Sequence, residues 1–337
     1  MEKTGEDLKM KRARYFALFT GLCLLTVIII LQDIGEVFGV LGRVGGNVFY
    51  IFLYFVLPLG CTVCATYILI PGPLRPEPGD RWFGNLLVSS VNWLLPVAQI
   101  GGWIARVHWL SKRRVPISIA GASAFVDITL QAFAQSMVGI LGLILLIYFF
   151  WQEKVLIFSG LLVAVLLLLS VYILYKIQNK GVFFYLTKFC KSTSFGQELA
   201  QYVENFQAID FEVKALYGKR QRVIISVLLR FIARILFAGE IYIVFYILGH
   251  PISFLDAIFL ESLGQTIRAA SFLVPGSYGI QEGGYVVIGL MLGLPTNYCL
   301  ATALTKRVRE LFVGGCTLLI WQWREGKIHF LENKLNK

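Results

Sequence analysis

Apolar runs long enough to cross a lipid bilayer recur along this chain, and they decide its fold class. A spanning helix needs about 20 mostly apolar residues, and the stretches 47–70, 117–150 and 155–176 reach that length. Hydrophobic residues make up 57% of the sequence and charged residues only 15%, whereas soluble domains average about 25% charged residues. The sequence therefore predicts an all-α polytopic membrane protein with little room for a soluble domain.

The distribution of Lys and Arg predicts how the spans are oriented. The spans are expected at 15–32, 47–70, 117–150, 155–176, 223–248, 257–274, 279–295 and 298–321. Basic residues then gather at both termini and in the loops of the same side, while the opposite side carries only Arg43 and Lys154. Because cytoplasmic loops carry the excess of Lys and Arg, we expect cytoplasmic termini and an even number of transmembrane helices, about eight.

The net charge of +11 belongs mostly to this cytoplasmic rim. Basic residues beside membrane spans attract anionic lipid headgroups, by about 1 kcal/mol per Lys or Arg, so we expect membrane lipid and not nucleic acid as the partner. A single transmembrane domain is expected over 1–337, and within it 177–222 is expected to form a cytoplasmic amphipathic loop. The first apolar segment, 15–31, follows a basic N-terminus but has no small-residue cleavage site after it, so we interpret it as a retained span.

Two apolar segments, 82–110 and Pro275–Pro295, contain residues that break helices. Broken backbone at membrane depth is tolerated only where it is buried in protein or lines a water-filled cavity. We therefore predict re-entrant or broken helices at both segments. The expected break positions are Pro96, Gly101, Gly102, Pro275, Gly276 and Gly279.

Polar side chains inside the predicted spans are the candidate functional residues, because an intramembrane charge costs about 2.5–3.5 kcal/mol on insertion scales. Asp127 and Gln131 are spaced to share one helix face, and Glu261 and Gln265 repeat that spacing. The candidate substrate-binding or translocation residues are Asn92, Gln99, Arg106, Asp127, Gln131, Glu261, Gln265, Arg268, Glu282, Arg307, Arg309 and Glu310. We expect them to surround one polar cavity closed by apolar walls.

Structural alternatives exist for many of these residues. Arg230 and Arg234, near the start of a span, can snorkel to the cytoplasmic surface. Two pairs have the alternative role of an ion pair that only fixes helix packing: Arg307 with Glu310, and Glu261 with Arg268. Function is favoured for Asp127 and Glu282, because neither has a basic neighbour within a turn in the sequence.

Motifs of soluble enzymes are missing from the sequence. It contains no GxxxxGK[ST], GxSxG or HExxH, its three histidines are scattered, and most of its six cysteines lie in apolar runs. We therefore expect no metal, no cofactor and no enzymatic activity. A membrane-embedded enzyme that modifies a lipid headgroup, or an accessory subunit of lipid biosynthesis, remains an alternative hypothesis.

Two stretches of the chain resemble a known family. They are NWLLPVAQIGGWIARVHWL, and LGQTIRAASFLVPGSYGIQEGGYVVIGLMLGLP followed by LTKRVRELFVGG. The matching positions are Asn92, Pro96, Gln99, Gly101, Gly102, Arg106, Asp127, Gln131, Pro275, Gly276, Gly279, Glu282, Lys306, Arg307, Arg309 and Glu310. These positions resemble the flippase-like transmembrane family typified by the membrane half of lysylphosphatidylglycerol synthase, and within it the hopanoid-biosynthesis-associated HpnL-like branch.

This resemblance implies a polytopic fold with broken helices around a lipid-accessible cavity, in the bacterial inner membrane. It also implies lipid translocation between leaflets. As further partners we expect a second copy of the chain or lipid-biosynthesis enzymes. The candidate lipids are an aminoacyl or anionic phospholipid, a hopanoid, a glycolipid and a polyprenyl carrier. Many relatives have Gly-Gly after the proline, whereas Ser277 stands in the second place here, and no soluble aminoacyltransferase domain follows the spans. We therefore expect that the chain does not make an aminoacylated lipid alone.

Overall fold

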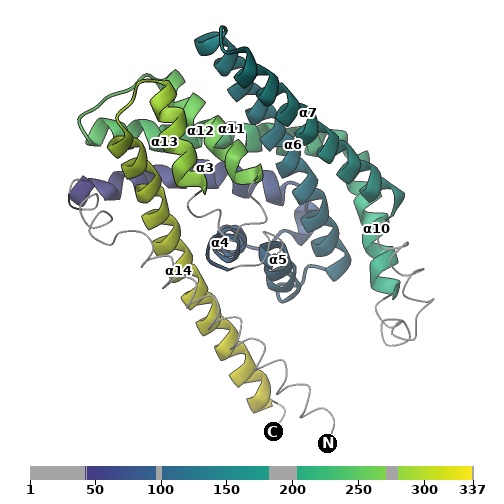
Figure 1. The fold of residues 1–337 in the computed structure, drawn as a ribbon. Coiled ribbons are helices and arrows are strands. Elements are labelled where there is room, and N and C mark those ends of the chain that lie inside the picture. The colour runs from purple at the N-terminus through teal and green to yellow at the C-terminus, as the bar shows by residue number, and fades with distance from the viewer. Residues whose placement is uncertain (1–41, 43, 96–100, 182–202, 271–279, 336–337) are drawn as a thin grey trace, which may run out of the picture.

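The computed structural model describes residues 42, 44–95, 101–181, 203–270 and 280–335. Over these ranges the chain forms ten α-helices, two 3-10 helices and no strand, which confirms the all-α membrane class. The elements are η1 (Gly45–Asn47), α3 (Val48–Tyr67), η2 (Gly72–Leu74), α4 (Pro78–Leu94), α5 (Gly101–Ser111), α6 (Ile117–Phe150), α7 (Lys154–Lys180), α10 (Val203–Gly218), α11 (Arg220–Ile247), α12 (Phe254–Ala270), α13 (Ile280–Met291) and α14 (Thr296–Leu335). Figure 1 shows their arrangement.

Three stretches of the described helices are long and apolar enough to cross a membrane, namely Gly45–Tyr67, Ile117–Phe150 and Lys154–Lys180. All three coincide with predicted spans. The number of helices differs from the prediction, because the segment 82–110 forms two helices and 177–222 contributes α10. The predicted span at 15–32 lies outside the described residues.

The segment 82–110 folds back on itself as the α4–α5 hairpin. Helix α4 begins at Pro78, where a proline is favoured because its missing N–H is not needed in the first turn. It ends at Leu94, because the next residue, Leu95, has the extended conformation (φ −107°, ψ 141°) that is imposed on a residue preceding a proline. A Cβ atom on Gly102 would lie 2.4 Å from the Val88 carbonyl oxygen, so only glycine lets α5 approach α4 this closely.

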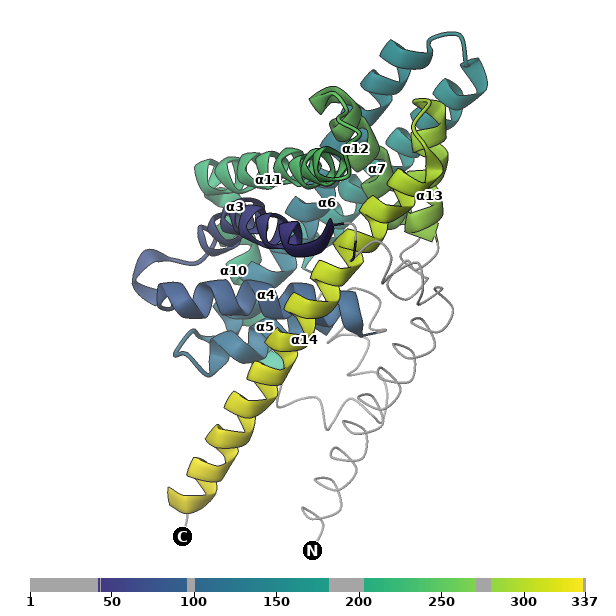
Figure 2. The same cartoon turned by 90° about the vertical axis from the view of Figure 1, so that its left-hand side faces the viewer.

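Helices α3 and α11 pack against each other along their lengths (Figures 1 and 2). The Tyr54 hydroxyl donates a hydrogen bond of 2.8 Å to the Leu236 carbonyl oxygen. Near the other end of α3, the Ser226 hydroxyl donates one of 2.7 Å to the carbonyl oxygen of Ala65. A later residue on α3 thus meets an earlier residue on α11, which means that the two helices run antiparallel.

The two longest described helices are α6 and α14, and each crosses a pair of helices that pack on each other: α6 crosses α12–α13, and α14 crosses the α4–α5 hairpin. Helix α6 packs on α12 and α14 packs on α4, and small residues make both approaches close. A Cβ atom on Gly142 would lie 2.7 Å from the Ser262 hydroxyl oxygen, and one on Gly314 would lie 2.9 Å from a methyl carbon of Leu94. Both hairpins are therefore held by a long helix from elsewhere in the sequence.

A cluster of aromatic and charged side chains ties α14 to the α4–α5 hairpin beyond the apolar core. The Arg324 guanidinium lies 5.0 Å from the ring centre of Phe83 and 5.6 Å from that of Trp109. Asp80 Oδ1 forms an ion pair of 2.8 Å with Arg113 Nε and lies 3.6 Å from Arg324 Nη1. The long helix is thus fastened to the hairpin by stacking as well as by charge.

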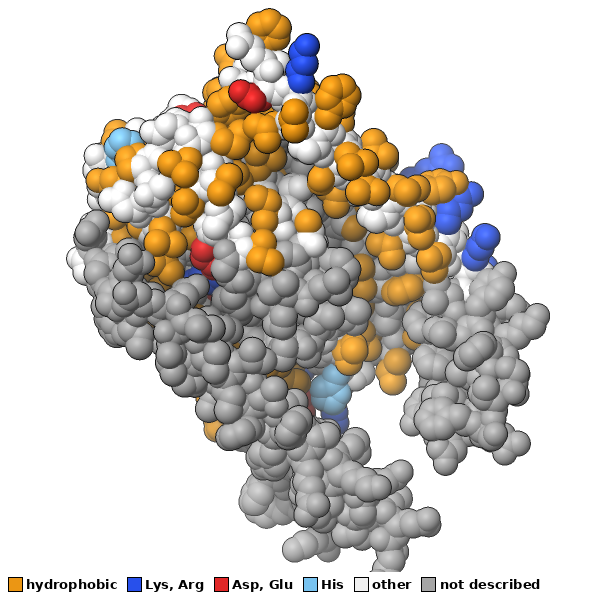
Figure 3. Space-filling view, in the orientation of Figure 1, with side chains coloured by type: hydrophobic (Ala, Val, Ile, Leu, Met, Phe, Trp, Pro, Cys, Tyr) orange, Lys and Arg blue, Asp and Glu red, His pale blue; other side chains and the backbone are white. Residues whose placement is uncertain are grey.

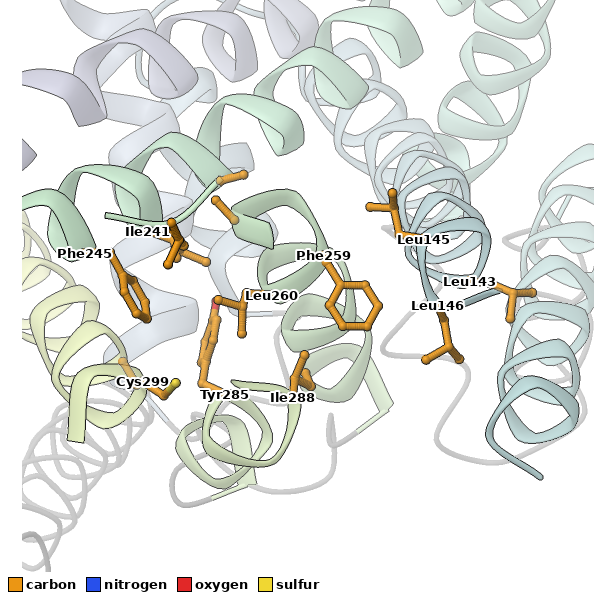
Figure 4. Close-up of a cluster of buried hydrophobic side chains, with 14 residues drawn as sticks. Leu143, Leu145, Leu146, Ile241, Phe245, Phe259, Leu260, Tyr285, Ile288 and Cys299 are labelled. Carbon is orange, nitrogen blue, oxygen red and sulfur yellow. The ribbon is translucent and has the colours of Figure 1, made fainter. Parts of the chain in front are cut away.

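Apolar side chains from α6, α11, α12, α13 and α14 form the largest buried cluster (Figure 4). Phe245, Phe259 and Tyr285 are its largest members, and each is at most 1% exposed. Apolar side chains also cover much of the visible outer surface (Figure 3). On α7 the exposed ones include Val155, Phe158, Leu162, Val165, Leu166, Leu169, Tyr172 and Ile173. A helix with apolar side chains all round is typical of a lipid-facing span.

Helix α10 comes from the predicted loop 177–222 and packs on α6 and α7. Its buried residues Ile209, Val213 and Leu216 join an apolar cluster with α6, while Phe211 is 72% exposed. The helix therefore packs on the predicted span α6, and the amphipathic character and cytoplasmic location of this segment stay predictions.

The close contact of α3 and α11 yields a stability test. A Cβ atom at Gly239 would lie 2.1 Å from the Tyr54 hydroxyl oxygen, whereas one at Gly283 would meet no atom of another part of the described structure within 4 Å. We expect Gly239→Ala to lower the thermal stability of the detergent-purified protein, since overpacking costs about 1–3 kcal/mol. Gly283→Ala is the matched control and should be neutral or stabilising, because alanine is the better helix former by about 1 kcal/mol. Equal melting temperatures for the two variants would contradict the packing described.

Candidate functional site

Charged side chains from several helices gather in the interior of the protein. They are Arg106 on α5, Asp127 on α6, Arg230, Arg234 and Glu240 on α11, Glu261 and Arg268 on α12, Glu282 on α13, and Lys306, Arg307, Arg309 and Glu310 on α14. All of these are buried except Arg234 and Arg268, which are half-buried. Such groups are stable in an apolar interior only when they are paired and hydrogen-bonded.

The first group, the Asp127 cluster, is centred on a carboxylate that is 0% exposed. Its Oδ2 accepts hydrogen bonds from Arg106 Nη1 (2.9 Å), Trp103 Nε1 (3.1 Å) and Gln131 Nε2 (3.2 Å). Its Oδ1 forms an ion pair with Arg230 Nη2. One carboxylate therefore serves two guanidinium groups, which come from different helices.

The arginines of this cluster have spare hydrogen-bonding capacity. Arg106 is 1% exposed, and its Nε and Nη2 atoms have no hydrogen-bond partner within the described residues. Arg230 Nη2 also donates to Thr66 Oγ1 at 3.1 Å, while its Nε has no partner within the same ranges. The Asp127 cluster thus holds more positive than negative charge.

The second group, the Lys306 cluster, joins α12, α13 and α14. Lys306 Nζ lies 2.5 Å from Glu261 Oε2 and 3.1 Å from the Tyr285 hydroxyl oxygen. The Tyr285 hydroxyl donates to the same Glu261 oxygen at 2.8 Å, and Gln265 Nε2 donates to the other at 2.9 Å. Glu261 is therefore the shared acceptor of three donors.

Arg307 extends the Lys306 cluster toward the second broken segment. Its Nε lies 2.6 Å from Glu282 Oε1, its Nη1 lies 2.9 Å from Glu310 Oε2, and its Nη2 donates to Gln281 Oε1 at 3.2 Å. Arg268 Nη1 reaches the other Glu310 oxygen at 2.8 Å. The first turn of α13 is thus fixed to α14 by the guanidinium of Arg307.

A third contact joins α14 to α11. Arg309 Nε lies 3.1 Å from Glu240 Oε1, and both side chains are at most 3% exposed. The Arg309 guanidinium also lies over aromatic rings, 4.1 Å from the centre of Phe55 and 5.5 Å from that of Trp93. Stacking on aromatic faces suits a weakly hydrated guanidinium in an apolar interior.

Helix α11 connects the two main clusters. Arg230 and Arg234 are four residues apart, so they lie on one face of the helix. Arg230 binds Asp127, and Arg234 Nη1 donates to Gln265 Oε1 at 3.3 Å. The described candidates therefore form two clusters linked through α11, and a cavity between them stays a prediction.

Several expectations from the sequence are corrected by this geometry. Arg230 is buried against Asp127, so the snorkelling alternative is wrong for it. Asp127 and Glu282 have no basic neighbour close by in the sequence, but both are paired with arginines, because other helices supply these partners. Glu261 pairs with Lys306 and not with Arg268.

Other candidates take different places. The pair of Arg307 with Glu310 is present at i, i+3. Asn92 Oδ1 accepts a hydrogen bond of 3.0 Å from the Gly102 N–H, so it holds the α4–α5 hairpin together. Gly101 is the first residue of α5. Gln99, Pro96, Pro275, Gly276 and Gly279 lie outside the described residues.

Trp103 and Tyr285 are part of the clusters but were not among the candidates. Trp103 lies one helical turn before the candidate Arg106, so the two share a helix face and the sequence already indicates Trp103. No sequence pattern indicates Tyr285. Within the described ranges, no group of three His, Cys, Asp or Glu residues is placed to hold a metal.

Comparison with known families identifies the class of protein. The family model for the lysylphosphatidylglycerol synthase transmembrane region matches residues 19–316. The chain belongs to this family. The matched range includes both charged clusters, and the family links the chain to lipid modification or transport in a membrane. Comparisons with curated proteins and with solved structures gave no significant match.

The Asp127 cluster yields a second stability test. Asp127→Asn would leave two buried guanidinium groups without their counter-charge. Removing one partner of a buried ion pair costs about 3–5 kcal/mol, so a large fall in the melting temperature in detergent is expected. Glu153→Gln, an exposed carboxylate at the α6–α7 turn, is the control and should change little. Similar melting temperatures for the two variants would show that the cluster does not support the fold.

Proposed function

We propose that this member of the lysylphosphatidylglycerol synthase transmembrane family moves a lipid between the leaflets of the bacterial inner membrane. The charge balance of the interior carries the proposal. The cationic side chains of the described clusters are Arg106, Arg230, Arg234, Arg268, Lys306, Arg307 and Arg309, and the anionic ones are Asp127, Glu240, Glu261, Glu282 and Glu310. Positive charges thus exceed negative ones by two in these clusters. Because an uncompensated buried charge is costly, the imbalance favours a negatively charged ligand.

The surplus falls on particular arginines. Arg106 and Arg230 share the single carboxylate of Asp127, and the hydrogen-bond partner of Arg234 is a neutral amide. Guanidinium groups bind phosphate in a fork geometry with two parallel hydrogen bonds. A lipid phosphate is therefore the group that these arginines suit best.

The chemistry narrows the candidate lipids. A phospholipid, an aminoacyl phospholipid or a polyprenyl phosphate supplies negative charge, whereas an uncharged hopanoid supplies only hydroxyl groups. The charge surplus thus favours a phosphate-bearing lipid, although the sequence motifs resemble the hopanoid-associated HpnL-like branch.

We favour transport over catalysis because the carboxylates of both main clusters are held by cationic groups. Asp127 lies between two arginines, Glu261 is bound to Lys306, and Glu282 is bound to Arg307. A general base needs a carboxylate aimed at a substrate proton. The membrane-embedded enzyme and the accessory subunit of lipid biosynthesis stay alternatives.

The orientation is proposed from the sequence. Both termini and the loop 177–222 would face the cytoplasm, where their Lys and Arg residues would meet anionic headgroups. The exposed apolar side chains of α7 would face lipid tails. A homo-oligomer or a complex with lipid-biosynthesis enzymes stays part of the proposal.

Reconstitution in vesicles tests the transport proposal. We expect the wild type to exchange fluorescent phosphatidylglycerol between leaflets, and Glu282→Gln, Arg268→Ala and Arg307→Ala to slow it about tenfold or more, equivalent to about 1.4 kcal/mol in the barrier. Lys154→Gln, which changes an exposed charge at the α6–α7 turn, is the control. Size-exclusion profiles would confirm that each variant is folded. Exchange at the wild-type rate in all three variants would rule out these residues as the pathway.

Lipid extracts separate transport from catalysis. Cells without a transporter should make every lipid species but retain one of them in the wrong leaflet, as leaflet-selective labelling would reveal. Cells without an enzyme should lack a species altogether. A missing species that returns on expression of the wild type would favour the enzyme alternative.

A further inference from the structure

Three arginines come together at one end of the α3–α11 pair, apart from the charged clusters of the interior. Arg75 follows η2 in the turn that joins α3 to α4 (left in Figure 2), Arg81 lies in the first turn of α4, and Arg222 lies in the first turn of α11. Burial, and then the charges of Arg222 and Arg81, lower the pKa of Arg75 from its ordinary value. Both neighbouring guanidinium groups are therefore close enough to act on Arg75.

The antiparallel pairing of α3 and α11 brings Arg222 to this place. The Ser226 hydroxyl donates a hydrogen bond of 2.7 Å to the Ala65 carbonyl oxygen near the end of α3. Val223 packs against the apolar cluster that includes Leu69. Because Arg222 lies one turn before Ser226 on the same helix face, it meets the turn that follows α3.

Backbone carbonyl groups hold two of the three guanidinium groups in place. Arg75 Nε donates to the Ile70 carbonyl oxygen at 2.9 Å, and its Nη2 donates to that of Ile68 at 3.4 Å. Arg81 Nε donates to the Pro76 carbonyl oxygen at 2.9 Å. These contacts orient the side chains but do not neutralise them, because a carbonyl group carries no net charge. The remaining donors of both guanidinium groups stay available to a ligand.

Carboxylates do not balance these arginines. Within the described part of the chain, none of the three forms an ion pair. Asp80, which precedes Arg81, is instead 2.8 Å from Arg113 and 3.6 Å from Arg324. Arg222 Nη1 is buried and has no hydrogen-bond partner in the same ranges. The group thus holds three positive charges without a counter-charge from the protein.

The positions of these arginines in their helices increase the demand for an anion. The N-terminus of a helix carries partial positive charge, so it favours an anion and disfavours a cation in the first turn. The first turn of α11 contains Arg220 and Arg222 but no acidic residue. The acidic residue in the first turn of α4 is Asp80, which is paired with Arg113. A bound anion would compensate the arginines and the ends of both helices.

This group is separate from the Asp127 cluster. Arg222 precedes Arg230 by eight residues on α11, which is about 12 Å along the helix axis. In the charge-based topology, the turn after α3 and the start of α11 both face the cytoplasm. The three arginines would then lie at the level of the lipid headgroups and not among the spans.

We propose that Arg75, Arg81 and Arg222 form a phosphate-binding site at the cytoplasmic surface, apart from the charged clusters of the interior. Phosphate is the class of anion that suits them, because a guanidinium group binds its oxygens through two parallel hydrogen bonds. A lipid headgroup and a soluble phosphate ester present the same group at this level. A basic rim attracts anions through its total charge, whereas this site depends on three fixed side chains. The site does not rest on the proposed transport function.

Charge-matched variants of the full chain test the site. We expect Arg222→Gln and Arg81→Gln to weaken phosphate binding about tenfold or more, because each loses charged hydrogen-bond donors. Arg222→Lys should also weaken it, since lysine keeps the charge but lacks the fork geometry. Arg220→Gln removes an exposed charge from the same turn of α11, so it is the matched control and should bind as the wild type does.

Two probes distinguish the source of the phosphate. Isothermal titration calorimetry of the detergent-purified protein measures inorganic phosphate, and native mass spectrometry from phosphatidylcholine nanodiscs with added phosphatidic acid measures the lipid. Binding of inorganic phosphate supports a soluble ligand, and retention of phosphatidic acid alone supports a headgroup. In either case the loss should occur in Arg222→Gln and not in Arg220→Gln.

Other results would overturn the proposal. Equal weakening in Arg220→Gln and Arg222→Gln would show that the basic rim acts only through its total charge. A wild type that binds neither probe would show that no phosphate site exists. Size-exclusion profiles confirm folding, and the separate variants on α4 and α11 keep the test decisive if one of them does not accumulate. The readout is binding and not leaflet exchange, so its outcome is independent of the transport proposal.

Discussion

The buried ion pairs of Asp127 with Arg106 and Arg230 are the interaction on which much of this structure depends. They join α5, α6 and α11 in a part of the protein where water is excluded, so each charge is stable only while the others stay in place. The Lys306 cluster plays the same part for α12, α13 and α14. Between them, the two clusters fix the helical hairpins to the spans around them, and the apolar contacts fill the remaining space.

Most of the fold could be predicted from the sequence, because membrane insertion leaves few choices. The runs 47–70, 117–150 and 155–176 are helices by the length and apolarity that a bilayer requires. The break after α4 follows from the steric restriction that Pro96 places on Leu95. The pairing of charges could not be predicted, because the partner of Glu282 is 25 residues away and that of Asp127 on α11 is 103 residues away. Spacing within one helix reveals a shared face but not the helix that covers it.

The family and the charge surplus support one picture of the molecule. Membership of the lysylphosphatidylglycerol synthase transmembrane family directs attention to lipid headgroups. The unequal number of buried cations and anions indicates which part of a headgroup would be held.

The stacking of Arg324 on Phe83 and Trp109 has a mechanical consequence. Helix α14 carries Lys306 and Arg307 in its first half and is fastened to the α4–α5 hairpin through Arg324 in its second half. An α-helix resists bending, so a tilt at one end displaces the other in the opposite direction about the point where the helix crosses its neighbours. Helix α14 can therefore act as a rigid lever, in which release of the Lys306 cluster at one end displaces the α4–α5 hairpin at the other.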